Sequence, residues 1–145
     1  MKKKISDVEV ADFVQAVGLL VRRARAAAAS QDLSWAEASA LGRLAKEGPA
    51  TTADLARTQG MRPQSMRTIL ATLEELGMVE RTPHATDGRQ VMITLTAKGA
   101  AEHKSSSDAK RTWFAQASDR LDDQDRETLF AAGKIMKRLA ESGQS

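Results

Sequence analysis

Apolar residues recur along most of this 145-residue chain at intervals of three and four, the spacing of one face of an α-helix. The clearest case is residues 63–76, whose apolar side chains are Met66, Ile69, Leu70, Leu73 and Leu76. The same spacing predicts further helices over residues 7–29, 34–47, 52–58, 97–121 and 122–141. The pattern therefore predicts a mainly α-helical protein.

The helical spacing is interrupted between residues 77 and 96. Val91, Ile93 and Leu95 alternate with Met92 and Thr94, which is the pattern of a half-buried strand. Residues 78–81 are a plausible partner strand, and the intervening residues 82–90 contain the turn formers Pro, Asp and Gly. This segment predicts a short β-hairpin.

Polar residues mark where the predicted helices begin. Ser34 followed by Glu37 has the form of a capping box, in which each residue satisfies a backbone N–H of the other. Thr51 and Thr96 are candidate caps of the helices that follow them. Residues 30–32, Ser-Gln-Asp, break the pattern between the first two helices. These residues predict separate helices instead of one continuous rod.

Glycines mark the helix ends. Gly48 with the following Pro ends one helix, and Gly77 follows the helix over residues 63–76. Gly60 permits the positive φ angle of a tight corner between two helices. Residues 105–108, Ser-Ser-Ser-Asp, form helices poorly, so two alternatives stay open there: a solvent-facing helix or a local irregularity.

A short helix, a glycine turn and a longer amphipathic helix form a helix-turn-helix, and a hairpin behind them makes a winged helix. The polar residues on the outer side of the longer helix, together with the residue before it, contain no acid and no Lys. They suit base edges and phosphates, and they are Arg62, Gln64, Ser65, Arg67, Thr68 and Thr72. We expect its N-terminal half to enter a major groove, with Arg67 pairing with guanine. The alternative is a solvated face of a packing helix, but such faces are usually rich in Glu and Lys.

The hairpin carries candidate DNA contacts of its own. Arg89 is expected to enter a narrow minor groove, and Asp87 is expected to hold its guanidinium group by accepting its N–H groups. His84 is expected to touch a phosphate. The alternative is an ordinary surface hairpin whose screened ion pair contributes about 0–1 kcal/mol. The adjacent helix-turn-helix favours the DNA-binding interpretation.

Composition excludes several kinds of site. The chain has no Cys, which removes disulfides and zinc-thiolate sites. His84 and His103 lie far apart and have no acid at ligand spacing, so no metal is expected. The chain shows no nucleophile motif, phosphate loop or paired carboxylates in a Gly-rich turn, so neither an enzyme nor a cofactor is expected. The net charge of +3 permits nucleic acid without requiring it.

Nothing in the sequence predicts a membrane protein. The longest uncharged run, residues 13–21, is far shorter than the roughly 18 apolar residues of a membrane span and is interrupted by Gln15 and Gly18. Lys2–Lys4 resembles the start of a signal peptide, but acids occupy the place of its apolar region. We expect a soluble, cytoplasmic protein.

Taken together, these segments resemble the MarR family of bacterial transcriptional regulators over nearly the whole chain. The similarity is carried by short motifs in the family's order and spacing: Leu33-Ser34, Gly48-Pro49, Thr52 to Leu55-Ala56, Leu73 to Gly77-Met78-Val79 and Arg81, Asp87 to Arg89, and Leu95-Thr96 to Gly99. Each motif is weak by itself. The series in the right order is specific.

The resemblance implies a homodimer that binds a pseudopalindromic operator on double-stranded DNA and represses until a small molecule releases it. It implies an N-terminal dimerisation helix over residues 1–32, a winged helix-turn-helix lobe over 33–98 and C-terminal dimerisation helices over 99–145. It assigns DNA contacts to Gln64, Ser65, Arg67, Thr68, Asp87 and Arg89. Many relatives have Arg or another long polar residue where this chain has Thr68 and Thr72, so its base contacts are expected to be shorter or water-mediated.

The resemblance also implies a ligand pocket where the dimerisation helices meet the lobe. Candidate lining residues are Phe13, Trp35 and Trp113, and the expected ligand is apolar or a weakly acidic aromatic with Arg22 or Arg23 as a carboxylate partner. The alternative is that these aromatics are core or interface residues. For the whole protein, the alternative to a DNA-binding repressor is a winged-helix module that binds proteins without reading a DNA sequence.

Overall fold

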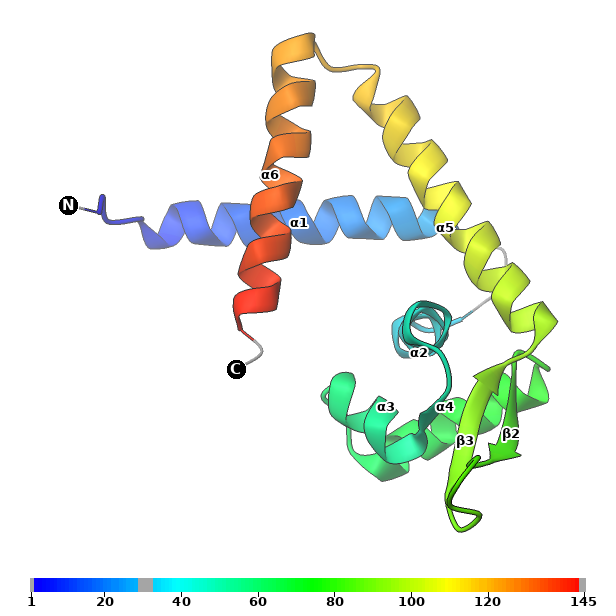
Figure 1. The fold of residues 1–145 in the computed structure, drawn as a ribbon. Coiled ribbons are helices and arrows are strands. Elements are labelled where there is room, and N and C mark those ends of the chain that lie inside the picture. The colour runs from blue at the N-terminus through cyan, green and yellow to red at the C-terminus, as the bar shows by residue number, and fades with distance from the viewer. Residues whose placement is uncertain (1, 29–32, 144–145) are drawn as a thin grey trace. The chain divides into compact units, whose positions relative to one another are not determined.

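The computed structural model describes residues 2–28 and 33–143. The chain divides into two compact units, namely residues 28–108, here called the lobe, and residues 1–27 with 109–145, here called the helical unit. In chain order (Figure 1) the elements are α1 (Asp7–Ala27), α2 (Trp35–Glu47), β1 (Ala50–Thr51), α3 (Thr52–Thr58), α4 (Pro63–Glu75), β2 (Val79–Pro83), β3 (Val91–Leu95), α5 (Ala97–Ser118) and α6 (Asp123–Ser142). The predicted fold class, mainly α with a small β-hairpin, is confirmed.

The predicted helix starts are confirmed where the structure describes them. Ser34 and Glu37 form the full capping box at the start of α2, and the side chain of Thr51 accepts the N–H of Asp54 at 3.1 Å at the start of α3. Arg57, whose Nη2 lies 2.6 Å from the Asp54 carboxylate, is the main reason that the pKa of Asp54 is lowered. The predicted break over residues 30–32 lies outside the described residues.

The sheet of the lobe has three antiparallel strands in the order β1-β3-β2. β2 and β3 form the predicted hairpin, with Val79 opposite Leu95 and Arg81 opposite Ile93. β1 was not predicted, because two residues are too short to show alternation. It pairs Ala50 with Ile93 and thereby attaches the start of α3 to the base of the wing.

The core of the lobe lies between α2, α3, α4 and the sheet. Its largest fully buried side chains are Leu41, Leu55, Met66, Leu70, Leu73, Met78 and Ile93. Three of the five apolar residues predicted for the α4 face are thus fully buried, and Ile69 and Leu76 pack at the edge. Each buried side chain of this size contributes roughly 1.5–3 kcal/mol of transfer free energy. This burial fixes which side of α4 faces outward.

The end of α4 is joined to the start of α5 by a dense set of hydrogen bonds. Gly77 adopts a φ of 73°, which lets the N–H of Met78 reach the carbonyl oxygen of Leu73 at 2.9 Å. Thr96 Oγ1 donates to the carbonyl oxygen of Gly77 at 2.5 Å, and Lys98 Nζ donates to that of Leu76 at 2.6 Å. The carbonyl groups that end α4 are therefore satisfied by residues at the start of α5.

Gly99 permits this close approach. A Cβ atom at position 99 would lie 2.0 Å from the carbonyl oxygen of Met78, so no other residue fits without a shift of the backbone. Thr96 caps α5 from the same place, since its Oγ1 also accepts the N–H of Gly99 at 3.1 Å. α5 then continues without interruption through residues 105–108, so of the two alternatives left open there the local irregularity is excluded.

In the helical unit, α1 and α6 carry large apolar side chains on their surfaces. On α1, Phe13 is 52% exposed and Val14 is 63% exposed, while on α6 Ile135 is 57% exposed and Leu139 is 70% exposed. No side chain of α6, which the structure describes throughout, is buried. Apart from Ala24 at the end of α1, which is buried, these apolar stripes stay largely exposed in the single described chain.

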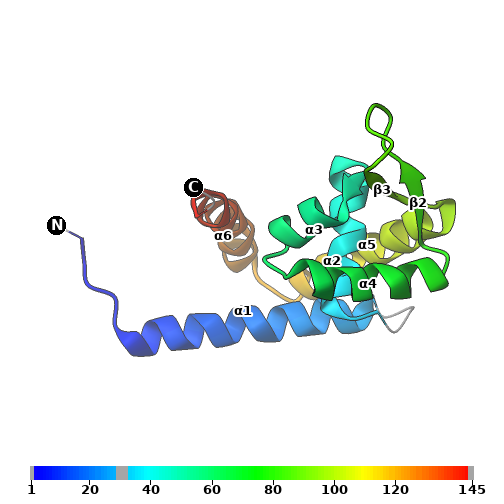
Figure 2. The same cartoon turned by 90° about the horizontal axis from the view of Figure 1, so that it is seen from below.

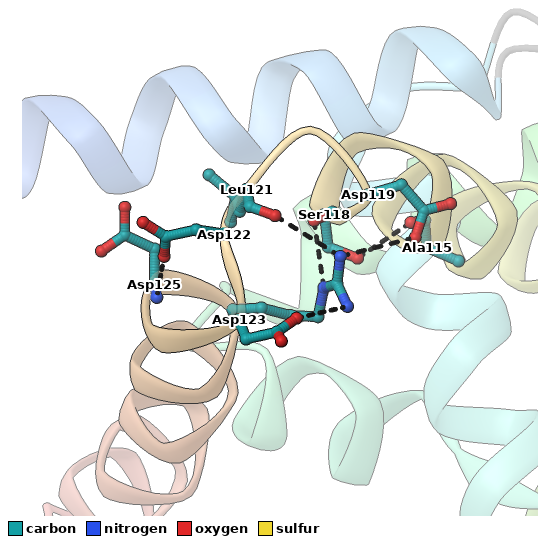
Figure 3. Close-up of polar contacts among 8 residues, drawn as sticks. Ala115, Ser118, Asp119, Leu121, Asp122, Asp123 and Asp125 are labelled. Atoms are coloured by element: carbon teal, nitrogen blue, oxygen red, sulfur yellow. Dashed lines mark hydrogen bonds and ion pairs between the residues drawn. The ribbon is translucent and has the colours of Figure 1, made fainter.

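Arg126 fixes the turn from α5 into α6 (Figure 3). Its Nε donates to the carbonyl oxygen of Ser118 at 3.2 Å and its Nη2 to that of Leu121 at 3.4 Å. Asp122 caps α6 by accepting the N–H of Asp125 at 2.8 Å. The helix predicted to reach residue 121 ends at Ser118, because the next residues form this turn.

Candidate nucleic-acid interface

The outer face of α4 is the face that the sequence predicted. Met66, Leu70 and Leu73 point into the core, and the exposed residues on the other side are Gln64, Ser65, Arg67, Thr68 and Ala71, with Thr72 half-buried. Arg62 occupies the N-cap position without a side-chain cap bond, and Pro63 begins the helix. The first-turn N–H groups of α4 therefore have no side-chain cap, which suits an anion such as a phosphate.

The two threonines of this face use their hydroxyl hydrogens inside the helix. Thr68 Oγ1 donates to the carbonyl oxygen of Gln64 at 3.3 Å, and Thr72 Oγ1 donates to that of Thr68 at 3.2 Å. The sequence predicts that this face, including both threonines, suits base edges and phosphates. In the structure their donor hydrogens are not directed outward.

The wing tip is closed by the ring of His84. The N–H groups of Thr86 and Asp87 both donate to His84 Nδ1, at 3.2 and 3.0 Å. This nitrogen therefore acts as an acceptor and carries no hydrogen, which leaves the ring hydrogen on Nε2. The backbone bond from the N–H of His84 to the carbonyl oxygen of Gln90, at 3.0 Å, closes the base of the loop. The predicted role of His84 at a phosphate stays a prediction, with Nε2 as the donor.

Asp87 does not hold the guanidinium group of Arg89 as we expected. Its Oδ1 accepts the backbone N–H of Arg89 at 3.1 Å, and among the described residues the two side chains form no ion pair. The reason is local, because a carboxylate reaches a backbone N–H two residues ahead more readily than the end of a long flexible side chain. Asp87 therefore shapes the wing tip by bonding to the backbone, and it does not hold the Arg89 side chain.

Arg67 and the base of the wing border the same open hollow of about 320 Å³. Thr51, Thr52 and Ala53 at the start of α3, Pro63 and Arg67 on α4, and Gln90 and Val91 at the start of β3 line it. The hairpin loop projects from the lobe beside these elements (Figure 2). The recognition face of α4 and the wing thus open onto one surface.

Residues 51–53 and Gln90 were not predicted as part of this surface. Their only sequence signal is proximity to Arg89 and to the cap of α3, whereas their position follows from the pairing of β1 with β3. On the opposite end of α4, Arg81 Nε lies 2.6 Å from a Glu74 oxygen and ties strand β2 to the helix. This pair also neutralises an acid next to the proposed DNA-binding face.

The predicted contact residues of α4 and the wing include three arginines. Within the described part of the chain, the guanidinium groups of Arg62, Arg67 and Arg89 form no ion pair. Free guanidinium groups beside an uncapped helix start are the groups that bind DNA phosphates and guanine edges.

The candidate ligand-pocket residues lie on different elements. Phe13, Arg22 and Arg23 are on α1, Trp113 is on α5 and Trp35 is the first residue of α2. Arg22 Nε donates to the carbonyl oxygen of Gly18 at 3.4 Å. Trp113 packs edge-on against Phe114, with ring centroids 5.0 Å apart. Trp35 belongs to the lobe and the others to the helical unit, so their pocket stays a prediction.

The described residues contain no cluster of three or more His, Asp or Glu side chains that suits a metal ion. Over the same residues, no helix has both the length and the apolar character needed to cross a bilayer.

Comparison with known proteins identifies the family of this chain. A family model described as "MarR family" matches residues 31–90. The HTH-type transcriptional regulator Mb0904 of Mycobacterium bovis is 36% identical to this chain, over 94% of this chain and 96% of the relative. The chain belongs to the MarR family. A second relative, the HTH-type transcriptional repressor Rv2887 of Mycobacterium tuberculosis, is 33% identical over 79% of this chain and 84% of its own length.

Solved structures share the MarR fold. RV1404 from Mycobacterium tuberculosis superposes with a TM-score of 0.83 at 22% identity, covering 100% of this chain and 99% of that one. The structure of NadR in complex with 4-hydroxyphenylacetate gives a TM-score of 0.68 at 22% identity, covering 97% and 96%. MarR proteins bind DNA and act as dimers. This MarR protein is accordingly a DNA-binding transcriptional regulator and not an enzyme.

The hydrogen bond from the Arg89 N–H to Asp87 can be tested for its contribution to DNA affinity. Asp87→Asn keeps an oxygen that accepts the N–H of Arg89 and removes a negative charge near phosphates, so DNA affinity is expected to stay level or rise. Asp87→Ala removes the acceptor and is expected to lower affinity about threefold, within the net value of one hydrogen bond. Fluorescence anisotropy with labelled DNA measures both. An equal loss in the two variants would show that the carboxylate charge is what the wing needs.

Proposed function

We propose that this MarR protein is a repressor that binds a pseudopalindromic operator, with α4 in the major groove and the wing in the adjacent minor groove. The observation that carries the proposal is the shared surface, because Arg67 of α4 and Gln90 of the wing base border one hollow. A groove-reading helix and an arm that follows the backbone must face the same side of the lobe to engage one duplex. The relative named as a repressor, Rv2887, supports the direction of regulation.

Within α4, Arg67 is proposed as the base-reading side chain. It is exposed, has no ion-pair partner among the described residues and stands one helical turn from Gln64. A guanidinium group donates to both O6 and N7 of guanine, and an amide such as that of Gln64 pairs similarly with adenine. Arg62 and Ser65, at the start of the helix, are proposed to contact phosphates. Arg89 is proposed to enter the minor groove.

The protein is proposed to act as a homodimer through α1 and α6. Each helix exposes apolar side chains, among them Phe13 and Val14 on α1 and Phe130 and Ile135 on α6, at 52–63% exposure. Large apolar surfaces of this kind on a single chain mark interfaces. A twofold dimer would present two copies of α4 to half-sites about 34–36 Å apart, or a multiple of it, along the duplex.

Release by a small molecule is proposed as the control of DNA binding. The support is the fold shared with NadR, whose structure holds 4-hydroxyphenylacetate, a weakly acidic aromatic compound. Arg22 and Arg23 on α1 are exposed cations of the kind that bind a carboxylate, and Phe13, Trp35 and Trp113 are the candidate apolar contacts.

The main test is selection of a binding sequence from random DNA, followed by fluorescence anisotropy over a range of salt. A palindromic sequence is expected, with steeply salt-dependent affinity and a preference of at least about a thousandfold over random DNA. Arg67→Ala is expected to lower affinity about 10- to 100-fold and to relax the preference for one guanine. Equal, weak binding to selected and random DNA would contradict the proposal.

Arg67→Lys is the matched control for that experiment. Lys keeps the positive charge and loses the planar fork, so a base-reading Arg67 predicts that Arg67→Lys relaxes specificity almost as much as Arg67→Ala. If Arg67→Lys instead retains both affinity and specificity, Arg67 contacts a phosphate and does not read a base.

The dimer is tested by a charge placed in the apolar stripe of α6. Ile135→Glu is expected to shift sedimentation from dimer to monomer, because burying an unpaired carboxylate in an interface is costly. Lys134→Glu, which changes the charge at the neighbouring position of the same helix, serves as the control. A dimer that survives Ile135→Glu at micromolar concentration would place the interface elsewhere.

The ligand proposal is tested by titrating the protein–operator complex with a panel of small aromatic acids that includes 4-hydroxyphenylacetate. We expect one of them to release the DNA at millimolar concentration or below, and Arg22→Ala or Arg23→Ala to raise the concentration required. Release that is unchanged in both variants would contradict the role of these arginines. Absence of release by the whole panel would contradict control by this class of ligand.

A further inference from the structure

The orientation of the hydroxyl groups of Thr68 and Thr72 on α4 determines which part of each side chain is left to contact a base. Thr68 and Thr72 each carry one hydroxyl hydrogen, and each donates it to the carbonyl oxygen four residues earlier, at 3.3 and 3.2 Å. Back-bonding of this kind is common for Thr inside helices. A hydroxyl group whose hydrogen is bonded to the helix backbone does not donate that hydrogen to a ligand.

The methyl group of each threonine is then the part of the side chain that faces away from the helix backbone. The hydroxyl and the methyl occupy different staggered positions on the same Cβ, so when the hydroxyl faces the helix backbone the methyl does not. Thr68 is exposed, and Ala71, on the same side of the helix, is exposed as well. Beyond Gln64 and Arg67, the outer face of α4 therefore presents methyl groups, from Thr68, Ala71 and partly Thr72.

We propose that α4 recognises thymine in the major groove through the methyl groups of Thr68 and Thr72, with Ala71 beside them, and not through their hydroxyl groups. The inference rests on the proposed function and specifies the DNA that the same site takes. Of the four bases, thymine alone carries an apolar group, its C5 methyl, on the major-groove edge, and Thr methyl and Ala are side chains that contact it. A·T pairs are thus expected where Thr68, Ala71 and Thr72 meet the operator.

The alternative chemistry for the same residues is acceptance of a hydrogen bond. The hydroxyl oxygen of Thr68 keeps lone pairs that accept from the amino group of adenine or cytosine. The two readings predict different groups on the DNA, a thymine methyl in one case and an exocyclic amino group in the other. They also predict opposite results for a variant that keeps only the methyl groups and a variant that keeps only the hydroxyl group.

The test on the DNA replaces single thymines of the selected operator by deoxyuridine, which removes only the C5 methyl. At one or two thymines in each half-site we expect the affinity to fall about fourfold per methyl, the effect of burying one methylene-sized apolar group. Replacements outside the half-sites are the control and are expected to change nothing. If no thymine in the half-site is sensitive, the inference is overturned.

The test on the protein compares Thr68→Val with Thr68→Ser, and the same pair at Thr72. Val keeps the shape and a methyl and has no hydroxyl, so Thr68→Val is expected to retain operator affinity and sensitivity to deoxyuridine. Ser keeps the hydroxyl and lacks the methyl, so Thr68→Ser is expected to lose about fourfold in affinity and to become insensitive to deoxyuridine at one position. The reverse pattern would assign recognition to the hydroxyl.

The outcomes separate this inference from the proposed function. If selection returns no preferred sequence, the proposed function fails. If a palindromic operator is found and depends on Arg67, but deoxyuridine is tolerated throughout, the repressor function stands and methyl recognition falls. Circular dichroism and thermal unfolding of each variant check that α4 is intact, and Val and Thr have similar helix propensities.

Discussion

The recognition helix depends on a close backbone crossing at its C-terminal end. The carbonyl oxygen of Met78 lies where a Cβ of residue 99 would be, so the start of α5 sits directly against the strand that follows α4. Thr96 and Lys98 donate to the carbonyl oxygens of Gly77 and Leu76, the residues that follow α4, at 2.5 and 2.6 Å. This contact needs Gly at position 99 and the φ of 73° that Gly77 adopts. It fixes α4 against α5 and the hairpin together.

The site follows from that constraint. α4 is anchored at its C-terminal end and through its buried face, while its N-terminal turn is left without a side-chain cap. Arg81 ties β2 to Glu74, and the two-residue strand β1 ties the start of α3 to the base of the wing. Rigid elements therefore carry the side chains that are proposed to contact DNA, and such rigidity limits the entropy lost on binding. The wing tip adds its own rigidity, because His84 and Asp87 accept the N–H groups of their loop.

Most of the fold was predictable because its signals are local. Apolar spacing, caps and positive-φ glycines act within a few residues, and the capping box at Ser34 and the strand Val91–Leu95 appeared where the sequence placed them. β1 and the end of α5 at Ser118 were missed for a physical reason. A two-residue strand exists only because β3 offers an edge, and α5 ends early where Arg126, from the next helix, donates to the carbonyl oxygen of its last residue, Ser118.

The sequence by itself determined the winged-helix architecture, the outer face of α4 and the identity of the cations on it, since these follow from periodicity and residue type. Only the tertiary structure decided that Arg67 lies beside Gln90 across one hollow. The folded chain also showed Asp87 bonded to the backbone of Arg89 and Thr68 bonded to Gln64, two local bonds that residue types alone leave open. A hydrogen atom goes to the nearest well-aligned acceptor, and such distances exist only after the chain has folded.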